Sequence, residues 1–177
     1  MPFKVGLGQD SHRFSHVHEK RDLFLGGVKI KGERGLKGNS DADVILHALF
    51  NSLAQIISWK SLGNHADKMC KEQGITDSKE YLKEPLKKLK EMDYFITTVG
   101  ITIECQKPKI DPVSDEIRES IANILGIEPE QVGIIATTGE RLTAFGKGEG
   151  IQVFTVITAI HKNVKDFAEN KTKKKKK

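Results

Sequence analysis

The sequence is poor in cysteine and in aromatic residues, and it has no long apolar run. Its 177 residues include two cysteines, Cys70 and Cys105, which do not form a CxxC pair. A disulfide framework is therefore not expected, and a reducing cytoplasm fits best. No segment approaches the roughly 18 apolar residues of a membrane-spanning helix, and the first residues do not form a secretory signal, so we expect no membrane partner. Aromatic residues make up 6% of the chain, which leaves few side chains for stacking on nucleic-acid bases.

The positive charge is concentrated at the C-terminus. The formal net charge is +5, and six of the positive charges belong to Lys171 and to residues 173–177. Removing these six from +5 leaves −1, so the rest of the chain is close to neutral. Nucleic-acid-binding proteins usually cluster their charge on a folded face, whereas a terminal lysine run is expected to be solvated and disordered. We therefore expect one domain over residues 1–162, a basic tail over residues 163–177, and no nucleic-acid partner.

The spacing of apolar residues predicts an α+β fold. Alternating or short apolar runs predict strands, and longer apolar or amphipathic segments predict helices. The strands are expected at residues 5–10, 99–105, 132–138 and 151–157, with a further strand or a hairpin arm at residues 23–30. The helices are expected at residues 44–57, 78–89 and 113–125. This order is typical of a ferredoxin-like sandwich, in which a mixed β-sheet carries helices on one face. Residues 58–77 have an irregular pattern in which only a short helix is expected.

Asp10 and His12 lie at the end of the first predicted strand. Residues i and i+2 of a strand project to the same side, so one carboxylate oxygen and one imidazole nitrogen are able to bind the same cation. One aspartate and two histidines are a reasonable ligand set for zinc with an open fourth position. For this short pattern alone, a solvated pair at a strand end is the more common explanation.

The segment from residue 39 to His47 offers a second group of polar residues at the start of an apolar helix. Residues 39–41 have N-cap chemistry, and the free N–H groups of a helix start suit phosphate. His47 is either a core histidine with one hydrogen bond or a third zinc ligand, whose second nitrogen Asp43 would then orient. Alone, the core explanation is favoured, and the aspartate and histidine of the first strand shift the balance towards a metal.

The region after residue 136 has the composition of a phosphate-binding loop. Thr137 and Thr138 precede the glycine-rich residues 139–150, and hydroxyls and glycine amides at a strand end can hold phosphate oxygens. Glu140 is able to bind a hard cation such as Mg²⁺ that is shared with phosphates, and Lys147 is able to neutralise diphosphate charge. A Walker motif is absent, and a glycine-rich hairpin with solvated charges is the alternative explanation.

Other segments carry weaker signals. Residues 107–112 contain two prolines, and this stiffened loop either reads a base edge or simply joins a strand to a helix. His16 and His18 have metal-ligand spacing, but no third candidate ligand lies near them in the sequence. His65 and His161 have no second candidate ligand in the sequence. No serine or cysteine stands out as a nucleophile.

Taken in order, these segments resemble the 2-C-methyl-D-erythritol 2,4-cyclodiphosphate synthase family. Its G-x-G-x-D-x-H motif reads Gly-Leu-Gly-Gln-Asp-Ser-His at residues 6–12, and its H-S-D-x-D-x-x-x-H motif reads Asn-Ser-Asp-Ala-Asp-Val-Ile-Leu-His at residues 39–47. Its P-K loop corresponds to residues 108–109. Its A-T-T-x-E and G-x-G-E-G segments correspond to residues 136–140 and 146–150. The similarity spans about residues 4–160.

The resemblance implies a lyase that acts on a phosphorus–oxygen bond. Such an enzyme converts 4-diphosphocytidyl-2-C-methyl-D-erythritol 2-phosphate into the 2,4-cyclodiphosphate and CMP, in non-mevalonate isoprenoid synthesis. It further implies a homotrimer with active sites between subunits, a zinc ion or another divalent transition metal, and a second ion, Mg²⁺ or Mn²⁺, on Glu140. The metal ligands implied are Asp10, His12, His47 and Glu140, and the residues that stabilise the transferring phosphate are Asn39 and Thr138.

The same resemblance implies a set of substrate-binding residues. Lys109, Ile110 and residues 137–138 would hold the cytidine side from a neighbouring chain. The full set is Asp10, His12, Asn39, Ser40, Ser61, Gly63, Lys109, Ile110, Thr137, Thr138, Glu140 and Lys147. Two positions depart from the family, since it has histidine where this chain has Asn39 and an aspartate for the ribose hydroxyls where this chain has Ser61.

Two other functions fit parts of the sequence. A zinc phosphohydrolase would use a metal-bound water as nucleophile and release inorganic phosphate. A non-catalytic nucleotide-binding or RNA-binding module on a ferredoxin-like fold would need aromatic residues on its central strands, where this sequence carries mostly valine and isoleucine.

Overall fold

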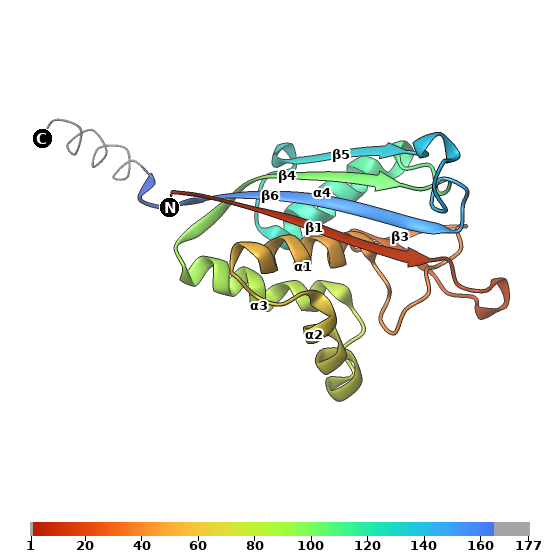
Figure 1. The fold of residues 1–177 in the computed structure, drawn as a ribbon, viewed down its shortest axis with the longest axis horizontal. Coiled ribbons are helices and arrows are strands. Elements are labelled where there is room, and N and C mark those ends of the chain that lie inside the picture. The colour runs from red at the N-terminus through yellow and green to blue at the C-terminus, as the bar shows by residue number, and fades with distance from the viewer. Residues whose placement is uncertain (1, 165–177) are drawn as a thin grey trace, which may run out of the picture.

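The computed structural model describes residues 2–164, apart from the side chains of Asp67, Lys68 and Lys71 (Figure 1). Almost all of the basic tail predicted for residues 163–177 therefore lies outside the described residues. The strands are β1 (Phe3–Arg13), β2 (Leu23–Leu25), β3 (Val28–Ile30), β4 (Tyr94–Glu104), β5 (Val132–Thr137) and β6 (Gly150–His161). The helices are α1 (Val44–Ile56), α2 (Leu62–Asp67), α3 (Ser78–Glu91) and α4 (Ser114–Leu125). Among the described residues, no helix has the length and apolarity needed to cross a bilayer.

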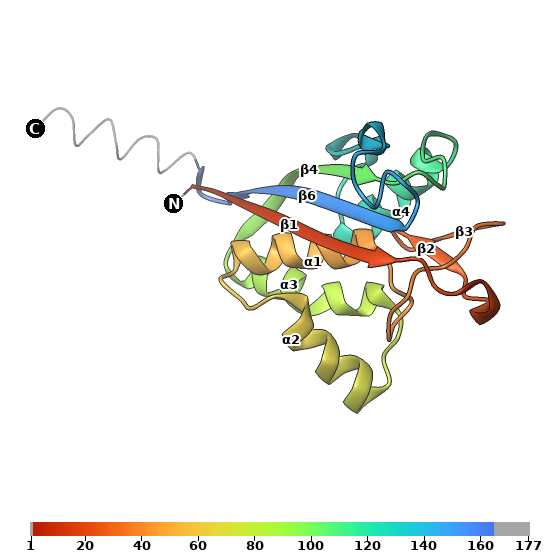
Figure 2. The same cartoon turned by 45° about the vertical axis from the view of Figure 1, so that its right-hand side comes forward.

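Four of the strands form one mixed sheet in the order β1-β6-β4-β5. β6 is antiparallel to both of its neighbours, and β4 and β5 are parallel, joined by the crossover through α4. Helices α1, α3 and α4 lie on one face of this sheet (Figure 1). Turned by 45°, the same structure shows α2 projecting from the helical layer away from the sheet (Figure 2). The expected α+β sandwich with a mixed sheet and helices on one face is confirmed.

Helix α1 is the centre of the core, as its apolar sequence predicts. Eleven of its residues are buried, because it packs against β1 and β6 on one side and against α3 on the other. Two glycines of β1 allow this close packing. A Cβ atom on Gly6 would lie 2.0 Å from the carbonyl oxygen of Ser52, and one on Gly8 would lie 1.9 Å from that of Ala48. The backbones of β1 and α1 therefore touch without intervening side chains.

The start of α1 differs from the sequence prediction. Residues 39–41 do not cap the helix, because its N-cap is Asp43. The Asp43 carboxylate accepts hydrogen bonds from the N–H groups of Ile45 and Leu46, and also from those of Gly26 and Gly27 between β2 and β3. Burial raises the pKa of this fully buried carboxyl, while the hydrogen bonds from these backbone N–H groups oppose the rise. Asp43 thus joins the β2–β3 hairpin to the start of α1.

Candidate functional site

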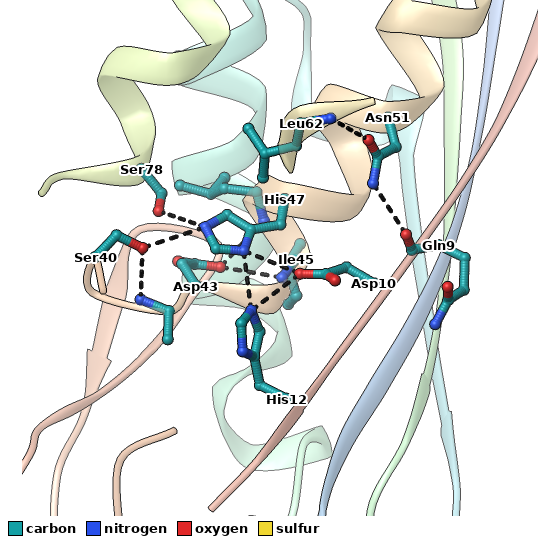
Figure 3. A network of polar contacts seen from close by, with 12 residues as sticks. Gln9, Asp10, His12, Ser40, Asp43, Ile45, His47, Asn51, Leu62 and Ser78 are labelled. Atoms are coloured by element: carbon teal, nitrogen blue, oxygen red, sulfur yellow. Dashed lines mark hydrogen bonds and ion pairs between the residues drawn. The ribbon is translucent and has the colours of Figure 1, made fainter. Parts of the chain in front are cut away.

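Three side chains from two elements meet at the contact between β1 and α1. Asp10 and His12 project from the end of β1, and His47 projects from the first turns of α1 (Figure 3). Asp10 Oδ2 lies 2.9 Å from His47 Nδ1 and 3.1 Å from His12 Nε2, and the two imidazole nitrogens are 3.1 Å apart. These residues, called the triad below, are the one group of three potential metal ligands among the described residues.

The three ligand atoms of the triad fit a metal ion. A tetrahedral zinc ion with ligand bonds of about 2.0–2.1 Å separates its ligands by about 3.3 Å. The observed separations of 2.9 to 3.1 Å are only slightly shorter. Two imidazoles and one carboxylate are also the donor types that zinc prefers. The triad therefore has donor atoms of the types and at the spacing that suit a divalent metal ion such as zinc.

The triad is electrostatically coupled. Burial alone would raise the pKa of Asp10, but hydrogen bonds and charge from His12 and His47 outweigh it and hold the pKa well below its usual range. Burial alone would lower the pKa of His12, but the hydrogen bond and charge of Asp10 outweigh it and raise the pKa above 6.5. The carboxylate is therefore ionised over the whole physiological range, and His12 holds its proton more tightly than a free imidazole.

The raised pKa of His12 predicts a pH dependence of metal binding. A protonated imidazole cannot bind a metal, so the proton on His12 competes with the ion. Because its folded pKa lies above 6.5, this competition begins at a higher pH than for a free histidine. The ionised Asp10 does not contribute to it. We expect zinc affinity to fall by about tenfold for each pH unit below that pKa. Competition with a chromophoric chelator at a series of pH values measures it, and an affinity that is constant from about pH 8 to about pH 6 would contradict the assignment.

Each histidine of the triad is oriented by a hydrogen bond at its other nitrogen. His12 Nδ1 donates to the carbonyl oxygen of Lys37 at 2.8 Å, which leaves its Nε2 facing the triad. His47 Nε2 lies 2.9 Å from Ser78 Oγ and 3.4 Å from Ser40 Oγ. The prediction that Asp43 orients His47 is wrong, because the Asp43 carboxylate is occupied by the four backbone N–H groups described above.

The triad lies in the wall of a cavity of about 330 Å³. Four residues implied by the family resemblance line this triad cavity together with the triad, namely Asn39, Ser40, Ser61 and Gly63. Asn51 holds the far wall in place, since its Nδ2 donates to the Gln9 carbonyl of β1 and its Oδ1 accepts from the Leu62 N–H of α2 (Figure 3). The triad cavity is thus lined by residues from β1, α1, α2 and α3 and from the segment before α1.

A second pocket lies at the carboxyl ends of the parallel strands β4 and β5. It has a volume of about 380 Å³. Lys109, Ile110, Thr137 and Thr138, which the resemblance implies for the cytidine side, all line this β5 pocket. The β5 pocket and the triad cavity have no lining residue in common. Within one chain, the structure therefore places the triad and the residues predicted for the cytidine side in separate hollows.

Glu140 and Lys147 lie in the loops between β5 and β6, and both are exposed. Neither side chain lines the triad cavity or the β5 pocket. Glu140 has a φ of 51°, a left-handed conformation that few non-glycine residues adopt. Within one chain, the structure does not bring Glu140 to the triad.

Several residues of the site were not predicted from the sequence. Ser78 is the first residue of α3 and is 31 positions from His47, so only its place at a helix start was visible. Tyr81, in the same turn, lines the triad cavity and donates to the Ile75 carbonyl at 2.7 Å. Burial, followed by the neighbouring Cys70, raises the pKa of Tyr81 to about 12. Tyr81 is therefore a neutral part of the cavity wall.

Comparison with known proteins gives consistent matches over most of the chain. Residues 3–160 match the model of the YgbB family. The chain is 42% identical over 158 residues to the 2-C-methyl-D-erythritol 2,4-cyclodiphosphate synthase of Chlamydia muridarum, covering 89% of this chain and 88% of that protein. Among solved structures, it is similar to IspF of Plasmodium falciparum in a CDP complex, with a TM-score of 0.79 and 27% identity, covering 91% of this chain and 97% of that one. The synthase structure from Plasmodium vivax matches with a TM-score of 0.75 and 29% identity, covering 90% and 99%.

Proposed function

This chain belongs to the YgbB family, and we propose that it is a 2-C-methyl-D-erythritol 2,4-cyclodiphosphate synthase. It converts 4-diphosphocytidyl-2-C-methyl-D-erythritol 2-phosphate into the cyclic diphosphate, with release of CMP, in non-mevalonate isoprenoid synthesis. The observation that carries the proposal is the triad, which lies beside a cavity in a chain that is 42% identical to a protein of that name. The family membership expected from the sequence motifs is confirmed.

The chain's own residues favour a mechanism of positioning and charge stabilisation. The reaction must bring the 2-phosphate of a flexible polyanion onto the β-phosphorus of its own diphosphate, and holding that geometry converts chain entropy into rate. A zinc ion, or another divalent transition metal, held by the triad would polarise a phosphate oxygen and neutralise its charge. Asn39, in the wall of the triad cavity, has an amide that can donate a hydrogen bond to a phosphate oxygen. Ser40, in the same wall, adds a hydroxyl.

The nucleotide side of the reaction fits the β5 pocket. Lys109 offers a positive charge and Thr137 and Thr138 offer hydroxyls, which are suited to a diphosphate. Thr138 would stabilise the transferring phosphate together with Asn39. Glu140 is an exposed carboxylate beyond the end of β5, and it would hold Mg²⁺ or Mn²⁺ together with diphosphate oxygens. Lys147 would neutralise further charge on the diphosphate.

Two observations support a homotrimer whose active sites lie between subunits. The triad and the residues proposed for the cytidine side occupy separate hollows within one chain. The sheet face opposite the helices also exposes large apolar side chains, because Gly6 and Gly8 face α1 and their neighbours on β1 point the other way. These exposed side chains on β1, β5 and β6 are Phe3, Val5, Leu7, Ile135, Phe154 and Val156. An apolar surface of this kind marks an interface, and closed cyclic symmetry would pair the triad cavity of one chain with the β5 pocket of the next.

The enzyme is proposed to work in the cytoplasm. Cys70 and Cys105 are both free thiols, which suits a reducing compartment. Burial raises the pKa of Cys105 to about 11, so this thiol is protonated and unreactive at neutral pH.

Product analysis tests the proposed reaction. Incubation with the cytidylated substrate, zinc and Mg²⁺ is expected to yield CMP and the cyclic diphosphate in equal amounts. ³¹P NMR and chromatography measure both products. A zinc phosphohydrolase would release inorganic phosphate instead, and a non-catalytic binding module would leave the substrate unchanged. Either of these results would contradict the proposal.

Mixing two inactive variants tests whether the sites lie between subunits. Asp10→Ala removes a metal ligand, and Lys109→Glu reverses a charge in the β5 pocket. In randomly mixed trimers, about a quarter of the sites combine an intact triad with an intact β5 pocket. We therefore expect co-refolded mixtures to recover about a quarter of wild-type turnover per site.

The matched control mixes Asp10→Ala with His47→Ala. Both ligands come from the same chain, so every triad in that mixture lacks one of them. No activity should return. Recovery in neither mixture would contradict sites shared between subunits.

A further inference from the structure

His47 is connected to a second carboxylate through a serine. His47 Nε2, the nitrogen that faces away from the triad, lies 2.9 Å from Ser78 Oγ (Figure 3). Ser78 Oγ in turn donates to Asp41 Oδ1 at 2.5 Å, and the Ser78 backbone N–H donates to Asp41 Oδ2 at 3.0 Å. Ser78 is fully buried and His47 is 6% exposed, so water has little access to the hydrogen bond between them, whereas Asp41 is half-buried. Asp41, Ser78 and His47 therefore form a continuous series of hydrogen bonds, called the relay, that ends at the triad.

Asp41 determines which atom donates and which accepts in each hydrogen bond of the relay. Its Oδ2 accepts the Ser78 N–H, and its Oδ1 accepts the N–H of Asp43 at 3.1 Å, so the carboxylate acts as an acceptor. The Ser78 hydroxyl must then give its only proton to Asp41, and only its lone pairs remain for His47. His47 Nε2 must therefore carry a proton and donate it. In a neutral imidazole, the lone pair then lies on Nδ1, which faces the triad.

Without this relay, the neutral ring has an alternative that blocks metal binding. His47 Nδ1 lies 2.9 Å from Asp10 Oδ2, so a proton on Nδ1 would have a good acceptor. That tautomer points N–H at the position of the ion and offers it no lone pair. Ser40 Oγ, at 3.4 Å from Nε2, is beyond the usual hydrogen-bond range and is a weaker substitute for Ser78. The tautomer of His12 is fixed by the Lys37 carbonyl, which accepts the proton of Nδ1. This acceptor is a backbone atom, so a side-chain substitution cannot remove it.

We propose that Asp41 and Ser78 are positioning residues that fix the tautomer of His47 and thereby set the metal affinity of the triad. This inference rests on the metal-binding role of the triad under the proposed function. It adds a hydrogen-bonded connection from α3 to a triad whose three ligands come from β1 and α1. Partners of this kind, which orient a metal-binding histidine, typically contribute 10- to 100-fold to affinity.

Replacing Ser78 by alanine tests the relay. We expect the zinc dissociation constant, measured by chelator competition, to rise about 10- to 100-fold. The matched control is Ser114→Ala. Ser114 is also the first residue of a helix, and its hydroxyl donates to the Asp111 carbonyl at 2.8 Å, so its loss should leave zinc affinity unchanged. A Ser78→Ala dissociation constant within about twofold of wild type would overturn the proposal.

A spectroscopic measurement separates tautomer control from a general loss of structure. In ¹⁵N-labelled, zinc-free wild type, where no metal fixes the tautomer, the proton of the neutral His47 ring should lie on Nε2 and give a downfield, slowly exchanging signal, because Ser78 accepts it. Ser78→Ala should lose this signal and keep that of His12 Nδ1, which donates to Lys37. An unchanged His47 signal would overturn the proposal.

A second variant covers the case in which Ser78→Ala does not fold. In Asp41→Asn, one carboxylate oxygen becomes an NH₂ group and can no longer accept the hydrogen bonds that now reach it. We expect a rise in the zinc dissociation constant in the same direction, and an unchanged value would overturn the relay. Failure of the relay is distinct from failure of the proposed function. The relay alone fails if the wild type binds zinc and releases CMP while the variants bind zinc equally well, whereas a wild type that binds no zinc defeats the proposed function itself.

Discussion

Replacement of His47 by alanine is expected to remove tight zinc binding and to lower CMP release by at least about 10³-fold. The triad then has two ligands, both from β1, and loses its only contribution from α1. A metal ion supplies several kcal/mol of transition-state charge stabilisation, and each 1.36 kcal/mol corresponds to a factor of ten in rate. Zinc content after dialysis and steady-state turnover with the cytidylated substrate measure the two effects.

The controls for this variant address folding and histidine number. His47 is buried, so alanine also leaves a cavity, and a thermal unfolding curve must show that the variant folds. His47→Gln keeps most of the volume and should lose zinc to a similar degree. His18→Ala removes an exposed imidazole that stacks on His16, outside the triad, and should retain zinc and turnover. Undiminished zinc content and turnover in a folded His47→Ala would remove the metal site from the proposal.

The sequence predicted the local half of the site. Asp10 and His12 are two residues apart on a strand, and the period of a strand is enough to place both on one side. His47 was ambiguous, because a histidine in an apolar helix fits a core position as well as a ligand position. Only the packing of α1 on β1 brings its Nδ1 to 2.9 Å from Asp10. From the sequence, the resemblance to the family grouped His47 with Asp10 and His12.

The polar partners around the triad were less predictable. Residues 39–41 have the composition of an N-cap, yet Asp43 takes that position because the β2–β3 hairpin offers it two further backbone N–H groups. Ser78 and Asp41 are 37 residues apart, and no local pattern reveals a hydrogen bond over that separation. Such contacts depend on how α3 packs beside α1, which the sequence period does not specify.

The fold was predicted where apolar spacing is regular. The alternation in β1, β4 and β6 and the apolar run of α1 correspond to elements with one or two buried faces. Residues 58–77 had no clear period, and the structure places α2 there, followed by a π-helical turn over Lys68–Glu72. This segment projects from the helical layer and contributes little to the core, so its sequence is free of the pattern that burial imposes (Figure 2).

Replacement of a β1 glycine by alanine is expected to lower the stability of the protein strongly. The β1 glycines occur in the motif at residues 6–12, but the sequence alone does not show that Gly8 is where strand and helix backbones touch. We expect Gly8→Ala to lower the free energy of unfolding by about 3 kcal/mol. Its Cβ would lie 1.9 Å from the Ala48 carbonyl oxygen and 2.6 Å from the Ser52 nitrogen. Both are backbone atoms of α1, so no side-chain rotation relieves the overlap, and β1 must move away by roughly 1 Å or more.

That movement would reach the triad, because β1 carries two of its ligands and α1 carries the third. The ligand atoms are only 2.9 to 3.1 Å apart, and a misplacement of about 1 Å at such a site can cost about 10²-fold. Gly8→Ala should therefore weaken zinc binding as well as stability, measured by chelator competition and by urea unfolding. Gly133→Ala on β5 is the matched control, since a Cβ there would have its nearest neighbour, the Val99 carbonyl oxygen, at 3.9 Å. A Gly8→Ala variant with the wild-type unfolding midpoint would show that the strand and the helix are not in backbone contact, and the triad would then need another explanation for its closeness.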